Sequence, residues 1–190
     1  MAFPMGTVID FESGAVARLQ RRIAETEAER ADLLAFGQGH WTATRSVHEA
    51  VLAVIASEHF DSLLRIVTEK WPAILGCDAV ALAFVSGKTG FRADDSGMHG
   101  VEARLVESLY AERHHTVLRS VDAGHPLFGP CAADLHAEAI IPLHETGRLQ
   151  SGLLLLGQSQ GEAEATPQGT ELLDFLGDSL AAMIGRWLPR

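Results

Sequence analysis

The histidines of this chain are its first candidates for chemistry, because imidazole nitrogens bind metal ions. His114 and His115 are adjacent, and His125 and His136 follow them closely. Adjacent residues of a strand point to opposite faces, so the adjacent pair cannot easily reach one ion. The sequence also lacks the Cys-x-x-Cys and His-x-x-x-His spacings of common metal sites. It therefore predicts no metal centre, and these histidines are interpreted as surface or structural residues.

Two cysteines, Cys77 and Cys131, are the next candidates. Two are too few for a disulfide framework, so reduced thiols are predicted. Cys77 follows a predicted helix and is interpreted as a small buried apolar residue. Cys131 lies in a Gly-Pro-Cys loop, where positive neighbours or a helix N-terminus could lower its pKa. A thiol-dependent redox enzyme that uses Cys131 is therefore kept as a distant alternative.

Two motifs of major enzyme classes are missing from the sequence. It has no Walker A loop and no Gly-x-Gly-x-x-Gly after a strand. Glu102, Glu107 and Glu112 are spaced like the solvated face of a helix rather than like a catalytic acid and base. We therefore predict no catalytic residues and a non-enzymatic protein.

The composition limits the partners that the protein can have. The chain has 190 residues, 25 of them acidic and 15 basic, with a formal net charge of −10 and 47% hydrophobic residues. The hydrophobic share is that of an ordinary globular protein. Nucleic acids and anionic membranes attract clustered positive charge, so neither is predicted as a partner. No signal peptide and no apolar run near the roughly 20 residues of a membrane span are visible, which favours a cytoplasmic protein.

The N-terminal part is predicted to be helical and to mediate self-association. Residues 1–13 carry no periodic pattern and are interpreted as a flexible arm. The stretch 14–36 is rich in Ala, Glu, Arg and Leu, which are strong helix formers. A heptad seam of apolar residues runs along it, although Thr26 and Arg30 interrupt this coiled-coil pattern. A helix packed on its own domain stays open, but the sequence favours a homodimer through Val16, Leu19, Ile23 and Leu33.

The rest of the chain is predicted to form more helices, a sheet and a closing helix. Gly37 and Gly39 predict a break at 36–39. Thr166 followed by Pro167 marks the start of the last helix, which would assist dimerisation. Helices are predicted at 41–58, 61–75 and 101–110, a loop at 94–100, and strands at 78–86, from 91, twice within 111–136, at 137–143 and at 149–157. This order predicts an α+β fold with a mostly antiparallel sheet.

Three passages resemble the GAF domain, a relative of the PAS fold. They are FDSLLRIVTEKWPAILGCDAVALAFV, the hairpin AEAIIPLHETGRLQSGLLLLG and the helix start TPQGTELLDFLGDSL. Leu127-Phe128-Gly129 and Gly169-Thr170 resemble elements of a bacterial family, domain of unknown function 484. The resemblance implies a GAF/PAS-like central antiparallel sheet flanked by helices, with a long N-terminal helix. It places a helical dimerisation and linker region at 14–58 and a GAF-like domain at 59–190.

The resemblance further implies a sensory or regulatory module, with any signal passing to a separate protein partner. The chain has no Asn and so lacks the signature of cyclic-nucleotide-binding GAF domains, and the ligand or cofactor stays unknown. We expect a small-molecule pocket between the sheet and residues 91–130. The residues predicted to line it are Arg92, Arg104, Tyr110, His114, Arg119, His125 and, as an apolar wall, Phe128. If the chain's own side chains fill this space, the protein is instead a ligand-free interaction adaptor.

Overall fold

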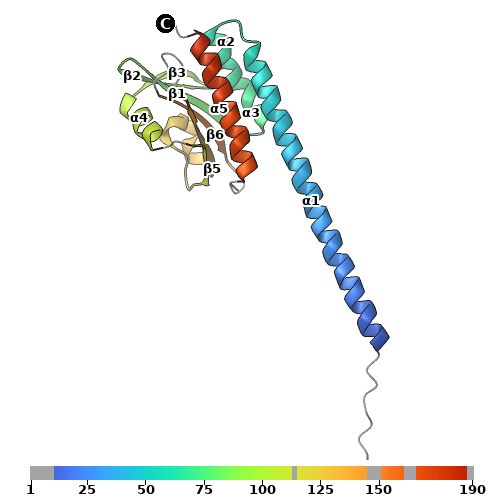
Figure 1. Cartoon of the computed structure of the whole chain (residues 1–190). Helices are drawn as coiled ribbons and strands as arrows, with labels where there is room; N and C mark the ends of the chain where they lie inside the picture. The colour runs from blue at the N-terminus through green and yellow to red at the C-terminus, as the bar shows by residue number, and fades with distance from the viewer. Residues whose placement is uncertain (1–10, 113–114, 145–150, 161–165, 188–190) are drawn as a thin grey trace, which may run out of the picture. The chain divides into compact units, whose positions relative to one another are not determined.

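The computed structural model describes residues 11–112, 115–144, 151–160 and 166–187, with backbone alone at 11–17, 19–20, 32–33 and 35–36. The chain divides into two compact units, Met1–Trp41 and Thr42–Arg190. The second unit contains the sheet and all helices after the first (Figure 1). Residues 1–10 of the predicted arm lie outside the described residues.

A single helix, α1 (Phe11–Ile55), replaces the two helices predicted before residue 59. The predicted break at 36–39 was therefore wrong. Gly37 and Gly39 lie inside α1, and a Cβ added at either would meet no heavy atom within 4 Å. A glycine inside a helix costs only about 1 kcal/mol relative to alanine. Because no proline accompanies the two glycines, the strong helix formers around them continue the helix.

The helix predicted at 61–75 folds as three consecutive pieces, which are α2 (Phe60–Arg65), a π-helical turn η1 (Ile66–Lys70) and α3 (Trp71–Leu75). The irregular turn ends two residues before Pro72, which has no N–H to bond the carbonyl of Thr68 four residues earlier. Gly76 ends α3 in the left-handed conformation, with φ of 68°, as its position after the helix predicted.

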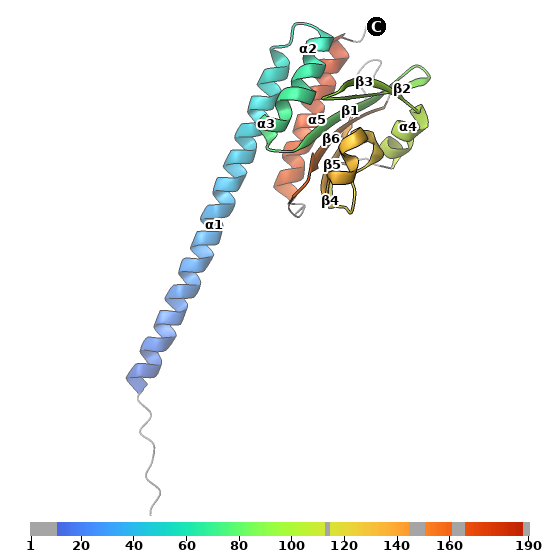
Figure 2. The same ribbon diagram turned by 180° about the vertical axis from the view of Figure 1, so that it is seen from behind.

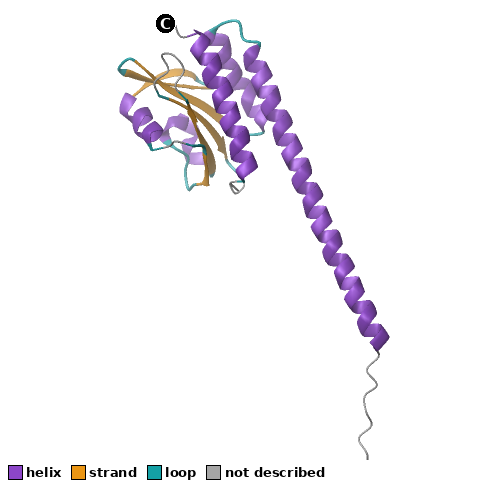
Figure 3. Ribbon diagram, in the orientation of Figure 1, coloured by secondary structure: helices purple, strands orange, loops and turns teal. Residues whose placement is uncertain are grey.

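Six strands form one antiparallel sheet in the order β3-β2-β1-β6-β5-β4. They are β1 (Ala79–Ser86), β2 (Thr89–Asp94), β3 (Gly97–Val101), β4 (Val117–Ser120), β5 (Ala137–Leu143) and β6 (Gly152–Gln158). Helix α4 (Ala103–Ala111) connects β3 to β4, and α5 (Pro167–Trp187) follows β6 (Figure 3). Because helices flank this sheet, the predicted α+β class is confirmed.

Two local predictions were wrong. The loop predicted at 94–100 contains strand β3, whose Gly97 and Gly100 weaken the sequence signal for a strand. One of the two strands predicted within 111–136 is β4, but in place of the other lies a 3-10 helix, η2 (Pro126–Asp134). Pro126 occupies the first turn of η2, where its missing N–H costs nothing.

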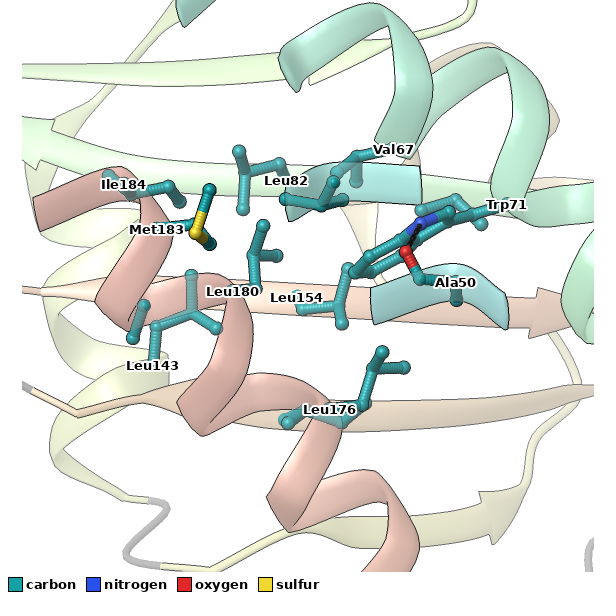
Figure 4. Packing of buried hydrophobic residues seen from close by; sticks show 14 of the residues in the cluster. Ala50, Val67, Trp71, Leu82, Leu143, Leu154, Leu176, Leu180, Met183 and Ile184 are labelled. Atoms are coloured by element: carbon teal, nitrogen blue, oxygen red, sulfur yellow. Dashed lines mark hydrogen bonds between the residues drawn. The ribbon is translucent and has the colours of Figure 1, made fainter. Parts of the chain in front are cut away.

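Helices α2, α3 and α5 and the end of α1 cover one face of the sheet, and α4 covers the other (Figures 1 and 2). On the first face, the indole Nε1 of Trp71 donates a hydrogen bond of 3.1 Å to the carbonyl oxygen of Ala50 (Figure 4). Leu176, Leu180 and Ile184 of α5 follow at helical spacing and are buried against the sheet. Val80, Leu82 and Phe84 of β1 belong to this core.

The opposite face is filled by the chain's own side chains. Ala81, Ala83 and Val85 of β1 alternate with the residues of the first core and point to this second core. Val106 and Leu109 of α4 pack on them. Further buried members are Leu127, Phe128, Leu135, Ile140, Leu153 and Leu155. Much of the space between the sheet and residues 91–130 is therefore occupied.

Candidate functional site

A cavity of about 590 Å³ lies at the end of the sheet where β1 begins and β2 turns into β3. Ligand sites usually measure about 300–1,000 Å³, so its volume suits a small molecule. Four segments meet there, namely η1 with α3, the start of β1, the β2–β3 turn and η2. The lining residues are Thr68, Glu69, Pro72, Asp78, Ala79, Val80, Asp94, Asp95, Ser96, Phe128, Pro130 and Cys131.

Asp94 is the most deeply buried carboxylate of this lining, with 7% of its surface exposed. Its Oδ1 accepts hydrogen bonds from the backbone N–H of Ser96, at 2.9 Å, and from the Ser96 hydroxyl. Its Oδ2 lies 2.8 Å from Nε of Arg92 in an ion pair. Burial alone raises the pKa of Asp94, but Ser96, Arg92 and His99 outweigh it and hold the pKa below its usual value. The carboxylate is therefore ionised at neutral pH.

The guanidinium of Arg92 lies against Gly129 of η2. Gly129 has φ of 73° and ψ of −137°, a conformation that favours glycine. A Cβ at this position would come within 2.7 Å of Arg92 Cζ. Arg92 thus links the carboxylate of Asp94 on β2 to the backbone of η2. The neighbours of Gly129, Phe128 and Pro130, line the cavity.

Glu138 of β5 holds the start of η2 from the other side. It is 1% exposed, and its Oε1 accepts hydrogen bonds from Nε and Nη2 of Arg119, at 2.8 and 2.6 Å. Its Oε2 accepts from the backbone N–H of His125 at 2.7 Å. His125 Nδ1 in turn accepts from the backbone N–H of Leu127 at 3.2 Å, capping η2. Arg119 and His125 therefore meet at Glu138, where they position the helix that carries Phe128.

The seven predicted pocket residues are distributed unevenly around the site. Phe128 lines the cavity, and Arg92 contacts its wall. Arg104 is exposed on α4, and Tyr110 is half-buried beside the second core. His114 lies outside the described residues.

Sequence reasoning missed the acidic lining of the cavity. Glu69, Asp78, Asp94 and Asp95 all contribute to it. Asp78 Oδ2 accepts hydrogen bonds of 2.7 Å from the backbone N–H and the hydroxyl of Ser159, which lower the pKa of Asp78. The only sequence signal was the Asp94-Asp95 pair at the end of a strand. That pair is equally typical of a solvated turn.

Cys131 lines the cavity as a protonated thiol. Its Sγ donates to the carbonyl oxygen of Phe128 at 3.2 Å. Burial raises the pKa of the Cys131 thiol, and the negative charges of Asp95 and Asp94 raise it further. For Cys77, burial raises the pKa to about 12. Both thiols therefore lack the lowered pKa that thiol catalysis requires.

Alkylation of Cys131 by iodoacetamide at pH 7.5 is expected to be slower than that of free cysteine, since a raised pKa lowers the fraction of reactive thiolate. Mass spectrometry of the Cys131 peptide over time measures the rate. Urea-unfolded protein is the control and should react at the rate of free cysteine. Equal rates in folded protein and free cysteine would revive the thiol-dependent enzyme.

Across the described ranges, no three His, Cys, Asp or Glu residues are grouped as metal ligands. Over the same ranges, none of the helices combines the length and apolar character that crossing a membrane requires.

Solved structures with the same fold are GAF domains and related proteins. A GAF domain of a phosphoenolpyruvate-protein phosphotransferase from Coxiella burnetii aligns with a TM-score of 0.57 at 20% identity, covering 77% of this chain and 95% of that one. A GAF domain of a putative sensor histidine kinase from Pseudomonas syringae pv. tomato aligns with a TM-score of 0.53 at 17% identity, covering 81% and 92%.

A third similar structure is an enzyme. Free methionine-R-sulfoxide reductase from Neisseria meningitidis, in complex with its substrate, gives a TM-score of 0.53 at 18% identity, covering 72% of this chain and 84% of that one. No curated protein matches the chain. At these identities the structural matches show the fold, so the predicted GAF-like fold is confirmed. The profile of the family described as "Protein of unknown function, DUF484" matches residues 1–189, and the chain belongs to that family.

Proposed function

We propose that this protein is a non-enzymatic sensory or regulatory unit, which binds a small molecule in the cavity at the end of the sheet and acts as a homodimer. The observation that carries the proposal is the cavity of about 590 Å³ on a GAF-like fold. Two similar structures are GAF domains of a phosphotransferase and of a putative sensor histidine kinase, which supports a regulatory role. Ligand binding would change the surface of the dimer that a separate protein partner contacts.

The lining is suited to holding a small molecule in one orientation. Pro72, Ala79 and Pro130 supply apolar surface, while the carboxylates supply polar groups. Ligand sites combine a mostly apolar wall with a few placed polar groups. The wall formed by η2 is held in place by Glu138 and by the Arg92–Gly129 contact, so the site is largely pre-formed.

A thermal-shift screen of small metabolites tests ligand binding. Ala79→Trp places a large side chain in the cavity, because Ala79 lines it. We expect at least one compound to raise the Tm of the wild type, and Ala79→Trp to abolish that rise. Ala133→Trp, at an exposed position of η2, is the matched control and should keep it. If both Trp variants respond like the wild type, ligands bind elsewhere and the proposed site is wrong.

Exposed apolar residues of α1 support the homodimer. In the first unit, Ile23 is 56% exposed, Leu34 57% and Trp41 72%. Their spacings of 11 and 7 residues place them within about 20° of one another around a helix that turns 100° per residue. We call Ile23, Leu34 and Trp41 the α1 stripe. Ile23 is one of the four residues predicted for the dimer interface. The structure does not describe the side chains of the other three, which are Val16, Leu19 and Leu33. A second copy of α1 would cover this stripe.

A second apolar surface lies on the Thr42–Arg190 unit. Leu52 and Ile55 of α1 are 65% and 51% exposed, and Phe175 of α5 is 48% exposed. A groove of about 240 Å³ runs between α1 and α5. Its lining residues are Val51, Val54, Ile55, Trp71, Ser179, Leu180, Ala182, Met183 and Arg186. Burial of this surface by a second copy would add α5 to the dimer interface, as the sequence predicted.

A ligand-free adaptor is the second candidate function. The filled face under α4, where Val106, Leu109 and Phe128 are buried, favours it, because the space expected for a ligand between the sheet and residues 91–130 is largely occupied. An adaptor would show no ligand-induced rise in Tm for any compound while keeping the dimer. The thiol-dependent enzyme has less support, since the pKa of Cys131 is raised.

The cellular setting is also part of the proposal. The net charge of −10 supports a protein that binds neither nucleic acid nor an anionic membrane, and we propose that it works in the cytoplasm.

A further inference from the structure

We infer that the ligand of the cavity is an organic cation, an amine or guanidine carried on an apolar body. This inference rests on the proposed function, because it names the ligand class for the same cavity. It comes from the arrangement of charged and apolar groups around the cavity rather than from the acidic net charge of the chain.

The charged side chains of the lining are all negative. Glu69, Asp78, Asp94 and Asp95 line the cavity, and among the lining residues that the structure describes there is no Lys, Arg or His. An anionic ligand would meet like charges from three segments, on η1, at the start of β1 and at the β2–β3 turn. Unlike charges attract at the same sites, so the cavity selects for positive charge.

Arg92 neutralises only one of these carboxylates. Its Nε pairs with Asp94 Oδ2 at 2.8 Å, and its guanidinium lies against Gly129. Within the described part of the chain, Glu69 and Asp95 form no ion pair, and both are exposed. Two carboxylates at the cavity are thus left to bind a charge brought by a ligand.

The cavity also favours an extended organic cation over a single metal ion. In the described ranges the carboxylates do not gather into a group of three metal ligands. They instead share the lining with Pro72 and Pro130, which are not buried. An ammonium or guanidinium group could meet the carboxylates while an apolar body packs on the two proline rings.

Three probes of the same shape test the charge preference. 2-Phenylethylamine is a cation at neutral pH, 2-phenylethanol is its neutral counterpart, and 3-phenylpropanoate is an anion. Titration of the full-length protein, followed by NMR, gives a Kd for each probe. We expect the amine to bind at least tenfold more tightly than the alcohol and the alcohol more tightly than the carboxylate. The preference should shrink as NaCl rises from 50 to 500 mM, because salt screens partly exposed charges.

Charge-removing variants locate the effect. The double variant Glu69→Gln and Asp95→Asn should reduce the preference for the amine to about twofold or less. The matched double variant Glu107→Gln and Glu112→Gln, at exposed positions on and just after α4, removes the same charge and should keep the full preference. If both double variants lose the preference for the amine equally, the inference is overturned, because the net charge of the protein would then explain that preference.

The outcomes separate this inference from the proposed function. If the alcohol or the carboxylate binds as tightly as the amine, and Ala79→Trp abolishes that binding, the cavity binds small molecules but the inferred class is wrong. If none of the three probes binds, the inference is also overturned, while the metabolite screen still decides whether the cavity binds any ligand.

Discussion

Glu138→Ala is expected to lower the free energy of unfolding of the Thr42–Arg190 unit by about 2–4 kcal/mol. The carboxylate is 1% exposed and accepts three hydrogen bonds, two from Arg119 and one from the backbone of His125. Removing one member of a buried ion pair costs about 3–5 kcal/mol, because the other charge is left without a partner. The Arg119 side chain is 41% exposed and can regain water, so the expected loss is somewhat smaller.

Urea unfolding followed by circular dichroism measures this loss. Glu138→Gln should fall between the wild type and Glu138→Ala, since an amide oxygen can still accept from one donor but carries no charge. Glu107→Ala, at an exposed position of α4, is the control and should change stability by no more than about 0.5 kcal/mol. A Glu138→Ala protein as stable as this control would mean that the network does not hold η2.

The triple variant Ile23→Glu, Leu34→Glu and Trp41→Glu is expected to convert the proposed dimer into a monomer. The three side chains are more than half exposed in the single chain and share one side of α1. Burying a large apolar side chain contributes about 1.5–3 kcal/mol. Three such residues on each chain, replaced by like charges, should weaken the dimer by about a thousandfold or more.

Light scattering coupled to size-exclusion chromatography measures the mass of both forms at several protein concentrations. Ala28→Glu is the matched control, because its exposed position lies about 140° around the helix from Ile23. We expect this variant to stay dimeric. A wild type that is monomeric at all concentrations would refute dimerisation, and a triple variant that stays dimeric would exclude the α1 stripe as the interface.

The elements of this fold were largely predictable because their signals are local. Alternating small and bulky residues marked β1, and Thr166-Pro167 marked the start of α5. The predicted break at 36–39 failed because two glycines without a proline cost too little to end a helix. Strand β3 was missed because two of its five residues are glycines, and its pairing with β2 is a tertiary effect.

The candidate site was less predictable, since its lining comes from four segments that meet only in the folded chain. Proximity in sequence suggested Arg119 and His125 as ligand-binding residues; in the structure the Arg119 side chain and the backbone N–H of His125 bind Glu138. A lone charge in the apolar strand AEAIIPL was a signal for such a partner, because a buried carboxylate needs donors. Glu69 and Asp78 carried no comparable signal, as charged residues on helices and next to turns are normally solvated.

Native mass spectrometry of the purified full-length protein tests the central claim, a homodimer with a small molecule in the cavity, most directly. The account predicts a mass of two chains with an added mass of a small molecule, and loss of that added mass in Ala79→Trp but not in Ala133→Trp. The account is contradicted if the wild type and both variants all show no added mass, even after incubation with the compounds of the metabolite screen.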